Sequence, residues 1–244
     1  MNKKLLLLVF TTFISNILFA GTSLMGPTGI LNVPSPATVD KGFLEGGLHI
    51  TRYSFGSYNG DGTRYSFKAN FGAGDNAEIG FEKTIDDGNY LSDPGLTVTG
   101  KVAYNLGENL KFAAGAIFDS DSNDYSSAYC EFGSDFAFFG FGVNFGGHEA
   151  TFNHAAFGGY DFDSGKPDPA FFLAGAEFKI NKASFTIGYN GDKISLGLRA
   201  PIESEQATVD IGWMSKGDYE DYYKQIKNPN YSDNSFILGI SGTF

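Results

Sequence analysis

Apolar and polar residues alternate along most of the chain beyond residue 42, which is the pattern of β-strands with one apolar and one polar face. The stretch 64–72 shows it plainly, with Tyr65 and Phe67 on one face and Ser66 and Lys68 on the other. The same period of two predicts strands over 43–53, 64–72, 77–84, 96–106, 110–118, 126–133, 136–146, 172–180, 183–189, 194–199, 206–213 and 236–244. We therefore expect an all-β fold of about twelve strands, with ten or fourteen as the alternatives.

One of these stretches, 136–146, carries aromatic residues in both registers. We take Ala137, Phe139 and Phe141 as its apolar outer face, which places Phe136 and Phe138 on the inner face.

Short and long connections alternate between the predicted strands. Short turns are expected near 72–76, 107, 135, 181 and 201–205, whereas longer loops are expected at 56–63, 86–95, 119–126, 147–169 and 216–234. The exception is the tight turn Asn190-Gly191-Asp192, which has the residues of a two-residue hairpin turn. Short turns at one end and long loops at the other are typical of outer-membrane β-barrels.

The aromatic residues of the apolar faces gather at the two ends of the strands. The ring at the loop end consists of Tyr65, Phe118, Phe172, Tyr189 and Trp213. The ring at the turn end consists of Phe71, Tyr104, Phe112, Phe178, Phe185 and Phe244. A soluble sandwich would share the alternation but not two aromatic rings, so the sequence predicts a transmembrane antiparallel β-barrel. We expect the terminal Phe244 to be recognised by the machinery that inserts such barrels.

The first twenty residues have the layout of a cleavable secretory signal peptide. Lys3 and Lys4 precede an uncharged apolar stretch that ends at Ala20. The alternative, a helical membrane anchor, needs a longer apolar span. The chain would then consist of a signal peptide (1–20), a Pro/Gly-rich segment (21–42) and a barrel (43–244) in the outer membrane of a Gram-negative-type bacterium, in contact with lipid and lipopolysaccharide.

The segment 21–42 is too rich in proline and glycine to form a helix. One hypothesis is that it folds back into the barrel as a plug, with Met25, Ile30, Leu31 and Val33 packed inside. The alternative is a flexible periplasmic leader.

The polar faces of the predicted strands carry charges of both signs. They are Glu45, His49, Lys68, Glu78, Glu82, Lys101, Lys111, Glu131, Glu177, Lys179, Arg199 and Asp210. Because neither sign dominates, we favour a polar lumen lined with paired charges over a charge-selective channel.

Composition excludes several other functions. The net charge is −11 and the pI about 4.6, which argues against a nucleic-acid partner. Cys130 is the only cysteine, so a disulfide framework or cysteine-based zinc site is excluded, and it is expected on the apolar face of its strand.

Candidate chemistry in the loops is weak. The run Asp119 to Asp124 lacks the glycine and glutamate of a calcium loop, so no metal is expected, and no cofactor motif is present. His148 and His154 lie near Ser164 without a recognisable orienting acid, which leaves an outer-membrane hydrolase as a less favoured alternative. Several tyrosines in 216–234 would suit sugar binding or packing on the barrel rim.

Two motifs carry a family resemblance. The run from Met25 to Ser35 reads MGPTGILNVPS, and the run from Tyr189 to Arg199 reads YNGDKISLGLR. They resemble the YjbH family of outer-membrane β-barrels, of which this chain would be a short, single-barrel relative. The resemblance implies an association with exopolysaccharide production or export, and hence a polysaccharide partner. A general small-solute pore and a structural envelope protein remain the alternatives.

Overall fold

The computed structural model describes residues 21–23, 27–54, 61–87, 96–120, 126–134, 136–145, 160–161, 166–202, 207–215 and 235–244. The expected signal peptide lies outside the described residues. No helix in the described part of the chain is long and apolar enough to cross a membrane.

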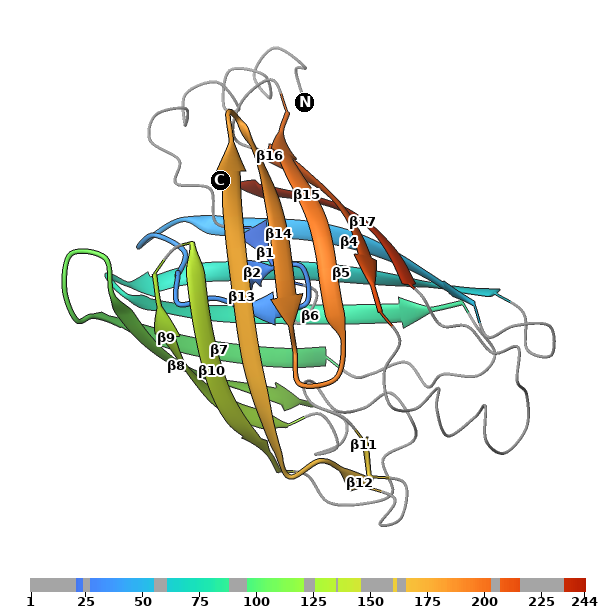
Figure 1. Ribbon diagram of the computed structural model, residues 1–244, viewed down its shortest axis with the longest axis horizontal. Helices are drawn as coiled ribbons and strands as arrows, with labels where there is room; N and C mark the ends of the chain where they lie inside the picture. Colours follow the sequence, from blue (N-terminus) through green and yellow to red (C-terminus); the bar gives the residue numbers. More distant parts are fainter. Residues whose placement is uncertain are drawn as a thin grey trace, which may run out of the picture.

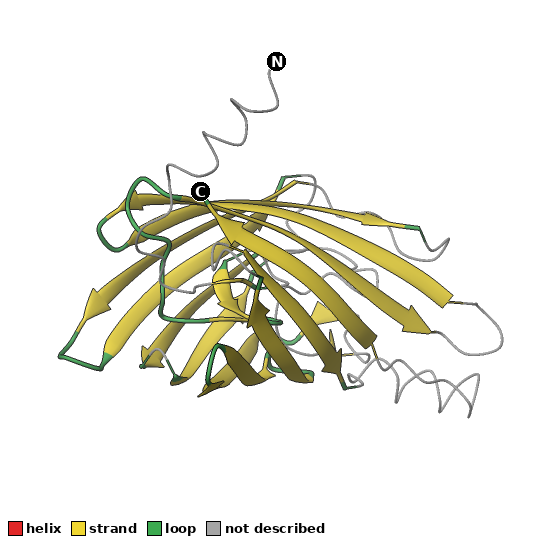
Figure 2. Cartoon of the chain, turned by 90° about the horizontal axis from the view of Figure 1, so that it is seen from above, coloured by secondary structure: helices red, strands yellow, loops and turns green. Residues whose placement is uncertain are grey.

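Twelve antiparallel strands form a closed barrel (Figures 1 and 2). In chain order they are β4 (Leu44–Ser54), β5 (Asp61–Gly74), β6 (Ala77–Asp86), β7 (Leu96–Asn105), β8 (Lys111–Asp119), β9 (Ser127–Gly133), β10 (Ala137–Asn144), β13 (Ala170–Ile180), β14 (Ala183–Tyr189), β15 (Ile194–Pro201), β16 (Ala207–Met214) and β17 (Ser235–Thr243). Each strand pairs with its neighbour in this series, and β17 pairs with β4 to close the ring. The predicted fold class and strand number are confirmed.

Closure satisfies the backbone groups that an open sheet would leave unpaired at its edges. The last strand is held along its length, from Phe236 opposite Arg52 to Thr243 opposite Glu45. Beyond it, the backbone of Phe244 exchanges two hydrogen bonds with Leu44, of 2.7 and 2.9 Å.

Residues with a left-handed backbone make two of the tight turns. Asn181 has a φ of 57° in the β13–β14 turn, and Gly191 has a φ of 98° between β14 and β15. Asn and Gly adopt this conformation more easily than other residues, so both turns follow from local sequence.

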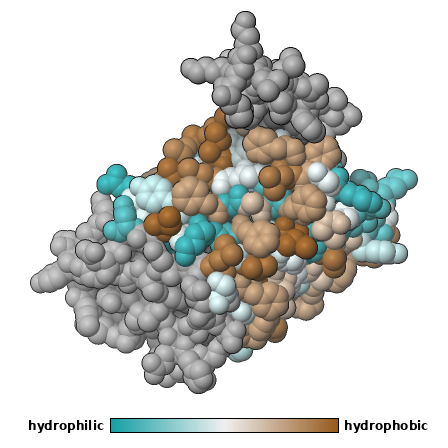
Figure 3. All heavy atoms as spheres, turned by 180° about the vertical axis from the view of Figure 1, so that it is seen from behind, coloured by the Kyte–Doolittle hydropathy of each residue, from teal (hydrophilic) through white to brown (hydrophobic). Residues whose placement is uncertain are grey.

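The outer face of the barrel is apolar and exposed, as the alternation requires. Phe67, Ile79, Phe81, Val102, Phe139, Phe141, Leu198, Ile211, Leu238 and Ile240 are among the exposed side chains. Figure 3 shows apolar side chains covering much of the wall seen from behind. So large an apolar surface is unusual for a protein in water.

Aromatic side chains lie near both ends of the strands. Phe71, Tyr104, Phe118, Phe172, Phe178 and Phe244 are exposed, and Tyr65, Phe112, Phe185, Tyr189 and Trp213 are half-buried. Some of these rings contact other aromatic rings. Phe112 on β8 and Phe132 on the neighbouring β9 have centroids 4.8 Å apart, and Phe118 on β8 and Phe145, just after β10, have centroids 5.8 Å apart.

The assignment of Phe136 to the inner face is wrong. Phe138 points inward and is buried, but Phe136 is 63 % exposed. Phe136 precedes β10, in the tight connection from β9, where Ser134 donates a backbone hydrogen bond to Ala137. The strand alternation therefore does not extend back to it.

A small sheet lies inside the barrel, made of β1 (Gly21–Thr22), β2 (Thr28–Ile30) and β3 (Val33–Pro34). Contacts join β1 to β4 and β17, and join β2 to β13 and β14. A separate pair, β11 (Tyr160–Asp161) and β12 (Lys166–Pro167), precedes β13.

Candidate functional site in the barrel lumen

The antiparallel strands β2 and β3 form a hairpin, residues 28–34, which we call the plug hairpin. Leu31 and Asn32 form its turn, and Ile30 pairs with Val33. Leu31 has a φ of 36°, a conformation that costs an L-residue other than Gly, Asn or Asp about 1–2 kcal/mol. Such a residue persists only where the surrounding structure compensates for it.

The side chain of Leu31 occupies a notch in the barrel wall and is only 2 % exposed. The notch exists because Gly197 on β15 and Gly212 on β16 face each other in register and have no side chains. A Cβ atom on Gly212 would lie 3.0 Å from both Leu31 methyl groups, and one on Gly197 would be closer still to Cδ1. Burial in this notch offsets the backbone cost.

Next to this notch, the amide of Asn32 joins the turn to the wall. Its Oδ1 accepts a hydrogen bond from the Ser195 hydroxyl. Both side chains are fully buried.

Lys101 on β7 and Glu78 on β6 form hydrogen bonds with the backbone of the plug hairpin and of the residues that follow it. The Lys101 ammonium donates to the carbonyl oxygens of Thr28 (2.9 Å) and Ser35 (3.0 Å). The Glu78 carboxylate accepts from the amides of Thr28 and Val39, both at 3.0 Å. The two charges are also 3.0 Å apart and buried, so they neutralise each other.

Arg199 on β15 holds the hairpin from another side of the barrel. Its terminal nitrogens donate to the carbonyl oxygen of Gly29 at 3.3 Å, while its Nε donates to Asp210 Oδ1 at 2.7 Å. His49 Nε2 lies 3.7 Å from the other oxygen of Asp210. Lys68 on β5 donates to the carbonyl oxygen of Ser23, which follows β1. Three wall cations therefore bind backbone carbonyl groups of the described residues of 21–42, which we call the plug segment or plug.

The lumen also has an apolar wall, of which the sequence analysis predicted only Phe138. Ile30 and Val33 belong to one buried cluster with Ile117, Tyr129, Phe138, Phe171 and Leu173. Within 170–176 both faces of the strand are apolar, so alternation alone does not distinguish the inner face. The signal was the succession of Phe171, Phe172 and Leu173 in one strand.

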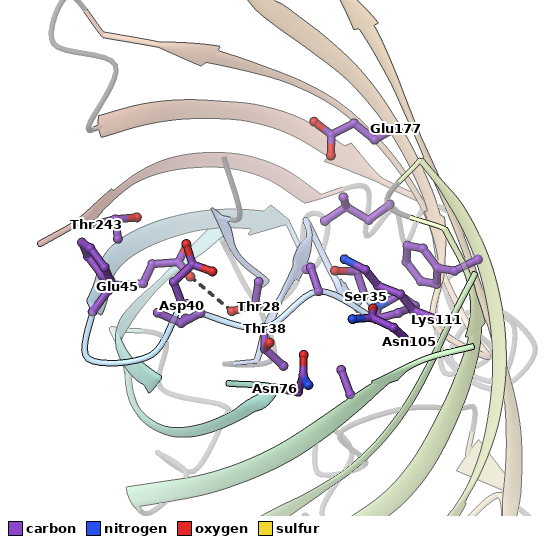
Figure 4. Close-up of a pocket in the computed structure, with 18 of the residues that line it drawn as sticks. Thr28, Ser35, Thr38, Asp40, Glu45, Asn76, Asn105, Lys111, Glu177 and Thr243 are labelled. Carbon is purple, nitrogen blue, oxygen red and sulfur yellow. Dashed lines mark hydrogen bonds between the residues drawn. The ribbon is translucent and has the colours of Figure 1, made fainter. Parts of the chain in front are cut away.

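A cavity of about 280 Å³ remains between the hairpin and the turn end of the barrel (Figure 4). It lies at that end because Asp75 and Asn76 of the β5–β6 turn, Asn105 at the end of β7 and Lys111 at the start of β8 line it. Thr28, Ser35 and Thr38 form the side made by the plug segment.

The predicted lumen residues fall into two groups. Glu45, His49, Lys68, Glu78, Glu82, Lys101, Glu131, Arg199 and Asp210 are buried inside the barrel. Lys111 and Glu177 are half-buried and Lys179 is exposed, and these three line the cavity. Polar atoms without a hydrogen-bond partner remain among the buried group, including both oxygens of Glu131 and Oε1 of Glu45.

The other predicted residues are placed as follows. Ile30, Leu31 and Val33 are buried in the lumen, whereas Met25 lies outside the described residues. Cys130 is half-buried, opposite Phe141 on the next strand. His148, His154, Ser164 and most of the acidic run 119–124 lie outside the described residues. Within the described ranges no group of three or more potential metal ligands occurs.

Comparison with known proteins supports the fold and nothing finer. No protein-family model and no curated protein matches the chain. Among solved structures, the NanC porin superposes with a TM-score of 0.53 at 14 % identity, covering 82 % of this chain and 98 % of that one. The outer membrane phospholipase A from Escherichia coli gives a TM-score of 0.40 at 12 % identity, covering 81 % and 92 %. The chain thus has the architecture of outer-membrane β-barrels, with residues 28–34 inside its lumen.

Proposed function

We propose that the protein is an outer-membrane barrel that works as a plugged channel, closed when residues 21–42 occupy the lumen. The observation that carries this proposal is that Lys101, Glu78 and Arg199 hydrogen-bond to the backbone of the plug. The donor–acceptor distances are 2.9 to 3.3 Å. Solutes would pass only when the hairpin leaves its place. The exposed apolar wall and its aromatic ends support a position in a bilayer.

The contacts explain why such a plug could be released. Three wall cations bind neutral carbonyl groups, and two of them, Lys101 and Arg199, have a carboxylate partner in the wall itself. If the plug leaves, these ion pairs remain, and water can replace the lost carbonyl groups. The displaced state therefore leaves few charges without a partner, which keeps its free energy low.

A second candidate is a role in polysaccharide production or export, which the family resemblance implies. It is favoured by the place of the motif: its residues Thr28, Gly29 and Ile30 form β2, and Val33 and Pro34 form β3. Residues 28–34 of the first motif thus lie in the lumen. A polysaccharide would then be the solute whose passage the plug controls.

Single-channel conductance in planar bilayers tests the proposal. The full chain and a variant lacking residues 21–36 are refolded, and a heat-modifiable shift on gels verifies that each barrel has formed. We expect few openings from the full chain and sustained current from the deletion variant. Equal conductance from two folded proteins would contradict the plug. Block of the deletion variant's current by oligosaccharides, but not by peptides of similar size, would support the second candidate.

A further inference from the structure

The barrel wall binds the backbone of the plug hairpin as well as its side chains. Thr28 is held at both of its backbone groups, because Glu78 accepts from its amide at 3.0 Å and Lys101 donates to its carbonyl oxygen at 2.9 Å. Arg199 donates to the carbonyl oxygen of Gly29, the next residue. The backbone of any peptide in the same conformation would offer these groups.

The wall cations have carboxylates beside them, so the wall favours neither an anion nor a cation at this place. Lys101 lies 3.0 Å from Glu78, and Arg199 Nε lies 2.7 Å from an oxygen of Asp210. Glu45 adds another buried carboxylate, which accepts from a hydroxyl group of the plug at 3.2 Å. A charged ligand would meet like charge here, whereas neutral peptide groups supply an acceptor for the cation and a donor for the carboxylate.

Besides the notch for Leu31, two wall glycines make room for the neighbouring side chains. Gly175 on β13 and Gly188 on β14 face each other in register. A Cβ atom on Gly175 would lie 2.8 Å from Cδ1 of Ile30, and one on Gly188 would lie 2.8 Å from Cγ2 of Val33. These recesses belong to strands that pair with each other, so they remain when the hairpin leaves.

The apolar part of the site distinguishes a peptide from a sugar. Ile30 and Val33 pack in a buried cluster with Ile117, Tyr129, Phe138, Phe171 and Leu173. A sugar hydroxyl placed against the aliphatic and phenyl groups of this cluster would lose its water without gaining a partner. An apolar side chain is transferred there favourably.

We propose that the site vacated by the plug binds short neutral peptides that carry an apolar side chain for the Leu31 notch, and that such peptides are the solute of the channel. This inference rests on the proposed plugged channel. Binding to the wall is measured without any current, so the two proposals can fail separately.

Calorimetry on the refolded variant lacking residues 21–36 tests the site, with folding verified by the heat-modifiable gel shift. One probe is the heptapeptide of residues 28–34 with both ends blocked, and the other is a blocked heptapeptide of unrelated neutral sequence with a central leucine. We expect both to bind, and to bind the full chain about tenfold more weakly or worse, because its own tethered plug competes. A neutral malto-oligosaccharide of similar mass should not bind.

Substitutions in the probe and in the wall locate the binding. Leu31→Ser in the first heptapeptide should weaken its binding about tenfold or more, because the burial of a leucine side chain is lost. Gly212→Ala in the deletion variant should weaken the binding of the unsubstituted heptapeptide several-fold, since its Cβ atom would lie 3.0 Å from both Leu31 methyl groups. The matched control is Gly100→Ala, whose Cβ atom would meet nothing within 4 Å.

Conductance separates this inference from the plugged channel. Peptides that bind the deletion variant and block its current support both proposals, whereas peptide binding to a folded deletion variant that conducts no better than the full chain contradicts only the channel. The peptide site is overturned if neither heptapeptide binds, if only the plug-derived one does, or if the oligosaccharide binds as tightly. It is also overturned if the full chain or Gly212→Ala binds the heptapeptides as tightly as the control.

Discussion

Filling the notch that receives Leu31 should release the plug without removing any part of it. In Gly197→Val the new side chain would occupy the space of the Leu31 methyl groups, because even a Cβ atom there lies too close to Cδ1. Valine is a good strand former. Its Cβ atom would also lie 2.9 Å from the Thr186 hydroxyl on β14, so the barrel accepts the change only if the Thr186 side chain rotates away.

The size of the effect follows from the burial of Leu31. Full burial of a leucine side chain contributes about 1.5–3 kcal/mol, and Leu31 is 2 % exposed. Loss of about 2 kcal/mol would raise the ratio of displaced to docked plug about 30-fold. Relief of the positive φ at Leu31 acts in the same direction.

The assay is open probability in planar bilayers, together with thiol labelling of Val33→Cys in a Cys130→Ala background. We expect both to rise in Gly197→Val. The control is Gly100→Ala, since a Cβ atom on Gly100 meets nothing within 4 Å. If the folded Gly197→Val protein conducts and labels like the control, the notch does not hold the plug and the reasoning is refuted.

Three further predictions concern the wall. Gly72→Ala should loosen the segment after the plug hairpin, because a Cβ atom there would overlap the Asp40 carbonyl, and we expect faster proteolysis near residue 40. The control Gly74→Ala, whose Cβ atom would make an ordinary 3.6 Å contact, should leave the rate of proteolysis unchanged. Lys101→Met should destabilise the folded barrel by about 3–5 kcal/mol, because it leaves buried Glu78 without its cation. The temperature of the heat-modifiable gel transition should therefore fall. An equal fall in Lys83→Met, which changes an exposed lysine, would contradict this role of Lys101. Cys130 should resist a membrane-impermeant thiol reagent in the folded, detergent-embedded protein and react after unfolding, whereas ready labelling of the folded form would mean that β9 faces the other way.

The sequence by itself determined the class of fold, because strand alternation is a local property. A period of two assigns each residue to one face, and turn residues such as Asn181 and Gly191 mark where strands reverse. The number of strands, their antiparallel order and the burial of charges such as Glu78 and Lys101 follow from that pattern. It was ambiguous only where both faces are apolar, as at Phe171 to Leu173, and at the strand end beside Phe136.

Only the tertiary structure decided what the interior contains. Leu31 meets Gly197 and Gly212, and Arg199 meets the Gly29 carbonyl, across more than 160 residues of chain. No local pattern encodes such pairs, because they depend on which strands become neighbours when β17 closes against β4. Closure brings distant wall residues around one short segment, and this convergence creates both the plug contacts and the cavity beside them.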